Sequence, residues 1–552
     1  MPEIKDGKLD LKAIGRKYLR QVKRNFSAPL LYEEIVRSKK GRIAHMGPVV
    51  IRTGSHAERP LDDQFIVRET PAGGIREVLW CHKDRKEMSW AHFESLYSRL
   101  ISYLEDKDVY VQRCYAGSVP EYRMSLRIVT ETAWHSLFVR NFFEPVTETG
   151  KAEADEPDFS IIHIPGFRAT PSVDGTRSSA FSILNLEQKV ILVAGTSYAG
   201  EILRAAFTAM NYMLPRNAVI PMRCSANVGS AGDVAVFFGR KGTGKTTLAI
   251  DPERSLVGDH ALGWSEKGLF SFDRGCYAKI HQLSPEDSPH IYQSTRTFGT
   301  ILENVAIDPE TRHVDLNDGS LTRNTRAAFS MSCLPNPVTS RTCGHPRYFF
   351  LLTRDALGVM PALVRLSPEL AIYYLLSGYT SRMTAEAKDA AETEDMFDTR
   401  FGVSALTLPP DIYADTLLEK IRKHDIRCWG LNTGWVGEPC GKGRRVGITH
   451  SRALIRAVLS GALADVRFET DPVFGFEVPE VCPGVPDALL DPRSVARDKG
   501  EYEVRANRLA AEFIREFSRT EHEIPEKIRS MLSHVISLED SYFDPESFGF
   551  SL

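Results

Sequence analysis

The chain has 552 residues, 42% of them hydrophobic and 26% charged, and its 69 Lys and Arg nearly balance 72 Asp and Glu for a formal net charge of −3. This length predicts two or more domains, and the composition excludes a disordered or fibrous chain. The balanced charge argues against a nucleic-acid or membrane-surface function across the whole chain, and no apolar run approaches the roughly 20 residues that span a bilayer. The first residues lack the apolar segment of a secretory signal, and the nine cysteines are scattered without a CxxC pair. We therefore expect a cytoplasmic protein with reduced thiols and no nucleic-acid or membrane partner.

Apolar spacing predicts a mixed α/β protein. Helices are expected over 91–104 and 134–143, and three strands between 159 and 194, in FSIIHI, FSILNL and KVILVAG. A helix is expected over 200–214, before Pro215, and further elements are a strand in VAVFFG, a strand in YFFLLT and a helix near 501–518. We place one junction near residue 220, which gives an N-terminal α/β substrate-side domain (1–220) and a C-terminal P-loop mononucleotide-binding domain (221–552).

A phosphate-binding loop follows the VAVFFG strand. The segment GRKGTGKT fits the pattern GxxxxGK[ST] between a strand and a helix, whereas a chance Gly-rich turn would rarely combine all these features. Glycines let backbone N–H groups face phosphate oxygens, and the start of the helix adds partial positive charge. Lys245 is expected at the β and γ phosphates, and the Thr246 hydroxyl is expected to ligate Mg²⁺. The expected nucleotide contacts of the loop are Gly239, Gly242, Thr243, Gly244, Lys245, Thr246 and Thr247.

An acidic residue is needed near such a loop to hold the metal. Asp259 ends the strand-like segment SLVG some 13 residues after the loop and is our candidate, with a turn-capping Asp as the alternative.

The sequence resembles the ATP-dependent phosphoenolpyruvate carboxykinase family from about residue 30 to residue 530. The ordered matching segments include YAGSVPEYR, AWHSLFVRN, PGFRATPSVDGTRS, GTSYAGEI, CSANVG, GCYAKI, LENV, DGSLTRNTRAAF and CPGVP. The resemblance implies a two-domain fold with the active site in the cleft between the domains. It also implies decarboxylation of oxaloacetate with transfer of the γ-phosphoryl of ATP, using Mg²⁺ and a second, transition-type metal. It assigns nucleotide contacts to Lys279, Arg445 and Ser451, and substrate contacts to Arg59, Tyr198 and Arg326.

Three family positions that hold the second metal differ in this chain. Arg204, Arg223 and His260 stand where the family has a lysine, a histidine and the second aspartate of its GDD motif. Arginine has no lone pair to donate, so we expect the second metal site to be lost. The arginines could instead bind an anionic substrate, or form structural ion pairs that fill the former site, and Cys224, His56 or Glu201 could rebuild a metal site.

The functional prediction depends on these differences between the chain and the family pattern. Lys241 stands where the family has the P-loop serine that faces the γ-phosphate. We predict that Lys241, Lys245, Asp259 and His260 are catalytic residues. Asp259 or His260 could act as the general base. We expect a repurposed ATP-dependent kinase, a monomer that phosphorylates a hydroxyl of a small polar or anionic acceptor. The alternatives are a genuine carboxykinase and a nucleotide-binding protein without catalysis.

Overall fold

The computed structural model describes residues 19–54, 61, 63–67, 85–146, 156–240, 242–377, 380–383, 393–396 and 410–520. The chain forms two compact units that alternate along the sequence. Unit 1 comprises Met1–Ala231, Ile250–Gly344 and Ser404–Leu408, and unit 2 comprises Gly232–Ala249, His345–Val403 and Pro409–Leu552.

The two units are not separated by one junction near residue 220, because each unit contains segments from several parts of the chain. Pairing between strands that are distant in sequence brings these segments together. The VAVFFG strand pairs in parallel with the strand Tyr348–Thr353, whereas strands of the segment 250–344 pair with strands that precede them in unit 1. The domain ranges 1–220 and 221–552 stay a prediction.

The largest sheet of unit 1 is mixed. In spatial order its strands are β1 (Gln21–Arg24), β6 (Asp108–Ala116), β7 (Met124–Thr130), β9 (Phe159–Ile164), β11 (Val190–Ala194), β10 (Phe181–Asn185), β4 (Gln64–Val67) and β5 (Arg85–Met88), with β8 (Glu144–Pro145) beside β6. The pairs β7–β9 and β9–β11 are parallel, whereas β6–β7 and β10–β11 are antiparallel. β9 and β11 are buried at every position, as is typical of strands with both faces covered.

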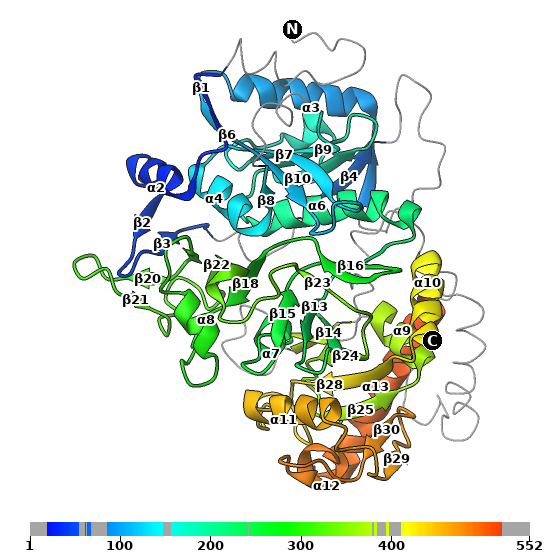
Figure 1. Cartoon of the computed structure of the whole chain (residues 1–552). Helices are drawn as coiled ribbons and strands as arrows, with labels where there is room; N and C mark the ends of the chain where they lie inside the picture. Colours follow the sequence, from blue (N-terminus) through cyan, green and yellow to red (C-terminus); the bar gives the residue numbers. More distant parts are fainter. Residues whose placement is uncertain are drawn as a thin grey trace. The chain divides into compact units, whose positions relative to one another are not determined.

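Helices cover both faces of this sheet (Figure 1). The helices of unit 1 are α2 (Ala28–Arg37), α3 (Trp90–Tyr103), α4 (Ala133–Phe142), α5 (Pro171–Asp174), α6 (Gly200–Met213) and α8 (Pro289–Ser294). Ile161 belongs to the core that includes α2, α4 and α6, whereas its neighbour Ile162 belongs to the core that includes α3. The two faces of the sheet therefore pack against different helices, and α6, which carries Glu201 and Arg204, lies on the same face as α2 and α4.

Smaller sheets of unit 1 carry other candidate residues at their strand ends. One has the order β18 (Gly275–Lys279), β22 (Arg326–Ser330), β19 (Ile301–Glu303), β3 (Val49–Ile51) and β2 (Gly41–Ile43). Another has the order β12 (Ile220–Met222), β16 (Leu262–Ser265), β17 (Gly268–Ser271) and β23 (Thr342–Cys343). β13 (Ser225–Val228) pairs with β15 (Ser255–Gly258), and β20 (Ala306–Ile307) pairs with β21 (Val314–Asp315).

Unit 2 is built on a sheet that carries the phosphate-binding loop. The strands that unit 2 contributes to this eight-stranded sheet follow the order β14 (Val234–Gly239), β24 (Tyr348–Thr353), β28 (Arg427–Asn432), β25 (Leu363–Leu366), β30 (Glu477–Pro479) and β29 (Phe468–Thr470). Separately, β26 (Thr380–Met383) pairs with β27 (Thr393–Met396). The pairs β14–β24 and β24–β28 are parallel. The helices of unit 2 are α7 (Lys245–Ala249), α9 (Pro368–Ser377), α10 (Pro410–Lys423), α11 (Ile448–Leu459), α12 (Pro492–Val495) and α13 (Lys499–Thr520).

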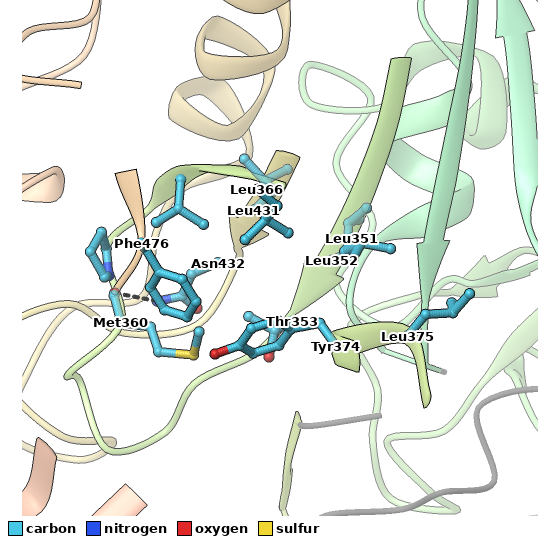
Figure 2. Close-up of a pocket in the computed structure, with 13 residues that line it drawn as sticks. Leu351, Leu352, Thr353, Met360, Leu366, Tyr374, Leu375, Leu431, Asn432 and Phe476 are labelled. Atoms are coloured by element: carbon cyan, nitrogen blue, oxygen red, sulfur yellow. Dashed lines mark hydrogen bonds between the residues drawn. The ribbon is translucent and has the colours of Figure 1, made fainter. Parts of the chain in front are cut away.

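A pocket of unit 2 lies against β24, β25 and β28 (Figure 2). Leu351, Leu366, Leu431 and Phe476 line it, and Asn432 Nδ2 donates a hydrogen bond to Met360 O across 2.9 Å. None of the side chains that line this pocket in the described part of the chain is charged. An anionic substrate would lose its hydration there without gaining a partner, so this pocket is not the candidate active site.

The predicted fold class is confirmed, and each predicted helix and strand is found within one to two residues of its expected bounds. Among the helices that the structure describes, none combines the length and the apolar character needed to cross a membrane.

Candidate active site

The phosphate-binding loop of unit 2 has the backbone geometry that its sequence predicts. β14 ends at Gly239, and Gly242 and Gly244 adopt φ of +90° and +96°, which L side chains rarely adopt. Lys245 Nζ donates to Gly239 O, which holds the ammonium group over the loop. These features arrange backbone N–H groups and one cation around a position suited to phosphate.

The loop after β28 is attached to the phosphate-binding loop. Thr433 Oγ1 donates to Thr243 O at 3.0 Å, and Arg445 Nε donates to Thr433 O at 2.8 Å. The structure therefore links Arg445 to the phosphate-binding loop through Thr433, and its contact with a nucleotide stays a prediction. Ser451 Oγ donates to Gly447 O within α11 at 3.2 Å, so the structure places Ser451 in unit 2 without joining it directly to the loop.

The predicted site also includes Lys279, Arg59 and Lys241. Lys279 is an exposed residue at the end of β18 in unit 1. Arg59 and Lys241 lie outside the described residues.

In unit 1, Asp259 follows β15 and lies in an acidic cluster. Its side chain is 4% exposed, and Ser225 Oγ donates to Asp259 O at 2.8 Å and to Oδ1 at 3.0 Å. Asp273 is also buried, and burial, together with the charge of Asp259, holds its pKa well above the usual range. His260 Nδ1 lies 3.6 Å from Asp273 Oδ2. The sequence reasoning found Asp259 and His260 but missed Asp273, whose only signal is its place two residues before the GCYAKI segment.

A second cluster of unit 1 surrounds Arg326 at the start of β22. Its guanidinium lies over the rings of Tyr198 and Tyr277, at 4.7 and 5.2 Å from their centres, and Nη1 donates to Tyr277 Oη at 3.4 Å. Tyr277 Oη donates to Glu303 Oε1 at 2.6 Å, and burial raises the pKa of Glu303 to about 7. Arg326 Nη2 is buried and has no hydrogen-bond partner among the described residues, so this N–H group is available to an anion.

The structure thus brings Tyr198 and Arg326 together and places two further residues beside them, while substrate binding by Tyr198 and Arg326 stays a prediction. Tyr277 and Glu303 were not singled out from the sequence, although both stand in matching segments, GCYAKI and LENV.

The two arginines at the expected positions of the second metal differ in their surroundings. Arg204 lies on α6 with 11% of its side chain exposed, and its Nη2 is 3.5 Å from Glu201 Oε1. Within the part of the chain that the structure describes, Arg204 Nε and Nη1 and Glu201 Oε2 are buried without hydrogen-bond partners. Arg223 lies between β12 and β13 and is partly exposed. The Arg204–Glu201 contact agrees with the predicted ion-pair alternative, and the unpaired donors agree with anion binding.

The donor set at these positions does not fit a transition metal. A guanidinium has no electron pair to donate, and the described ranges hold no group of three His, Cys, Asp or Glu side chains placed to bind a metal ion. A hydroxyl such as that of Thr246 in unit 2, and a carboxylate such as that of Asp259 in unit 1, are each the kind of hard oxygen donor that Mg²⁺ binds, and their joint role as ligands stays a prediction.

The comparisons with known proteins identify relatives along nearly the whole chain. The family model described as phosphoenolpyruvate carboxykinase matches residues 20–488. A phosphoenolpyruvate carboxykinase (ATP) of Pelobacter propionicus is 47% identical over 504 residues, which is 91% of this chain and 94% of the relative. The same-named protein of Thermus thermophilus is 46% identical over 512 residues, 92% of this chain and 96% of the relative. That of Geotalea uraniireducens is 44% identical over 504 residues, 91% and 94% of the two chains.

The prediction of a repurposed kinase acting on a hydroxyl is wrong in the light of these relatives, all of which are named carboxykinases. That prediction relied too heavily on the substitutions at the expected positions of the second metal. Fixed cations can stabilise developing negative charge without acting as Lewis acids, so those substitutions do not by themselves require a new acceptor. The chain belongs to the family of ATP-dependent phosphoenolpyruvate carboxykinases.

Proposed function

We propose that this protein converts oxaloacetate and ATP into phosphoenolpyruvate, ADP and CO₂. The observation that carries the proposal is the identity of 44–47% over about nine-tenths of the chain with relatives named for this activity. The phosphate-binding loop of unit 2 and the buried cations of unit 1 supply the two kinds of binding group that the reactants need.

The nucleotide side of the reaction falls to unit 2. Backbone N–H groups at Gly242 and Gly244 and the ammonium of Lys245 would hold the terminal phosphates, with Arg445 close to the same loop. Mg²⁺, bound with the nucleotide, would neutralise charge on the phosphate oxygens, with Thr246 and Asp259 as candidate oxygen donors. A general base at Asp259 or His260 is not needed, because an enolate is already deprotonated.

The substrate side of the reaction falls to unit 1. The unpaired Nη2 of Arg326 and the unpaired Nε and Nη1 of Arg204 are suited to the carboxylates of oxaloacetate and to the developing enolate oxygen. In the reaction the C–C bond to the departing carboxylate breaks as CO₂ leaves, its electron pair forms the enolate, and the enolate oxygen takes the γ-phosphoryl group while ADP leaves. Charge stabilisation by fixed guanidinium groups is therefore the contribution that we assign to these arginines.

We further propose that turnover needs only the Mg²⁺ that arrives with ATP, because the second metal position offers Arg204 and Arg223 in place of metal ligands. The loss of that second site stays a prediction. A small-molecule substrate, a monomeric chain and a cytoplasmic location also remain expectations, and light scattering after size exclusion tests the oligomeric state.

The test is an assay of phosphoenolpyruvate formation from oxaloacetate and MgATP, and of the reverse reaction, oxaloacetate formation from phosphoenolpyruvate, MgADP and bicarbonate. Lys245→Ala should lower turnover by about a thousandfold or more, because a cation at the transferred phosphate is removed. Lys499→Ala, an exposed lysine at the start of α13 in the same unit, is the matched control and should keep full activity. Wild-type protein that binds ATP but forms no phosphoenolpyruvate would refute the proposal.

A further inference from the structure

Arg354 lies at the sheet edge that carries the phosphate-binding loop, although no sequence motif singled it out. β24 pairs in parallel with β14 on one side and with β28 on the other, with Gly239 opposite Leu352 and Thr353 opposite Asn432. The carboxyl ends of the three strands therefore meet at one edge, where parallel α/β sheets bind their ligands. Since Arg354 follows Thr353 directly, strand pairing fixes its backbone beside the loop.

The side chain of Arg354 extends to the turn of the loop. Its Nη1 is 3.5 Å from the point that a β-carbon on Gly242 would occupy. Gly242 has a φ of +90°, and its turn is joined to the β28 loop through the bond from Thr433 to Thr243. The guanidinium thus stands beside the backbone N–H groups that such a loop turns toward phosphate oxygens.

Positive charge is concentrated at this edge. Arg354 is half-buried, and burial, with the charges of Arg445 and Arg240, lowers its pKa to about 10. Grouping like charges in a partly desolvated site raises the free energy of the protein, and a bound anion offsets that cost.

We propose that Arg354 is a phosphate-binding residue, with its guanidinium donating to the terminal phosphate oxygens of a nucleotide held by the loop. A guanidinium matches two phosphate oxygens at once, which a lysine ammonium at the same place cannot do. The proposal rests on the proposed function only in taking ATP as the nucleotide.

The test measures binding of ATP, ADP and AMP to the full chain by displacement of a fluorescent ATP analogue. Arg354→Gln should weaken ATP binding by about 10- to 100-fold, the usual loss for one charge-assisted hydrogen-bonding group. AMP binding should change by less than about twofold, because AMP lacks the terminal phosphates. Arg347→Gln is the matched control, because Arg347 is exposed and directly precedes the first residue of β24, at the end of the strand away from the loop. This variant should bind ATP like the wild type.

The outcomes separate this proposal from the proposed function. ATP affinity that is the same in Arg354→Gln and Arg347→Gln overturns it, and so does an equal loss for ATP and AMP, which would indicate a general structural defect. If Arg354→Gln does not fold, Arg354→Lys decides: weaker ATP binding with unchanged AMP binding supports the proposal, and unchanged ATP binding contradicts it. Wild-type protein that forms no phosphoenolpyruvate, while Arg354→Gln still loses ATP affinity, contradicts only the proposed function.

Discussion

Replacing Glu303 with glutamine should remove a pH-dependent loss of stability. The Glu303 side chain is 2% exposed, and burial raises the pKa of its carboxyl from 4.5 to about 7, although the hydrogen bond from Tyr277 Oη lowers it somewhat. Between these two values the unfolded chain has lost the proton and the native chain keeps it, so the free energy of unfolding falls as the pH rises. Each pKa unit corresponds to about 1.4 kcal/mol, which makes the whole loss roughly 3 kcal/mol.

Glutamine keeps an oxygen that can accept the bond from Tyr277 and cannot ionise. The wild type and Glu303→Gln should therefore have similar stability below about pH 4, where the carboxyl is largely protonated in both the native and the unfolded state. Above about pH 7 the variant should be more stable than the wild type by up to roughly 3 kcal/mol, because only the wild type then buries a charge.

The assay is urea-induced unfolding at about pH 5 and about pH 8, with the change between the two pH values compared for each protein. Glu105→Gln, an exposed glutamate of the same unit, is the control and should keep the wild-type pH dependence. An identical pH dependence in the wild type and in Glu303→Gln would refute the assignment of a buried, neutral carboxyl.

Further predictions concern the substrate cations, the metal requirement and the loop after β28. Arg326→Gln should raise the KM for oxaloacetate by about tenfold or more with the KM for ATP nearly unchanged, because it removes a buried cation of unit 1, and a parallel rise in both values would contradict its role. Micromolar Mn²⁺ added at saturating MgATP should raise turnover by less than about twofold, whereas strong stimulation would show that Arg204 and Arg223 do not replace the second metal. Asn432→Leu should lower the free energy of unfolding by at least about 2 kcal/mol, because its side chain makes four hydrogen bonds of 2.8–3.1 Å with nearby backbone groups, and unchanged thermal stability would contradict this.

The elements of this fold were largely predictable from local pattern. Apolar residues recur at helical spacing in α6 and form continuous runs in β9, β11 and β14, which favours a helix and strands, respectively. The phosphate-binding loop was predictable because its glycine spacing, Lys245 and the flanking strand and helix lie in one short segment. Ordered motif segments also predicted the family, which the relatives confirm.

The functional error has a physical origin. Side-chain identity predicts that Arg204 and Arg223 cannot donate an electron pair to a metal ion, and that His260 supplies at most one ligand at these three positions. Identity at a few positions does not specify the acceptor of a phosphoryl group, because that choice depends on the shape and charge of the whole substrate site.

The sequence by itself determined the secondary structure, the phosphate-binding loop and the family, because each depends on residues that are close together along the chain or on the order of many short segments. Three contacts were decided by the tertiary structure alone. His260 lies near Asp273, and Tyr277 donates a hydrogen bond to the buried Glu303. The guanidinium of Arg354 lies beside Gly242. These contacts depend on strands that pair across tens to hundreds of residues. Burial and neighbouring charge, which set the ionisation and binding properties of such groups, exist only once those strands are paired.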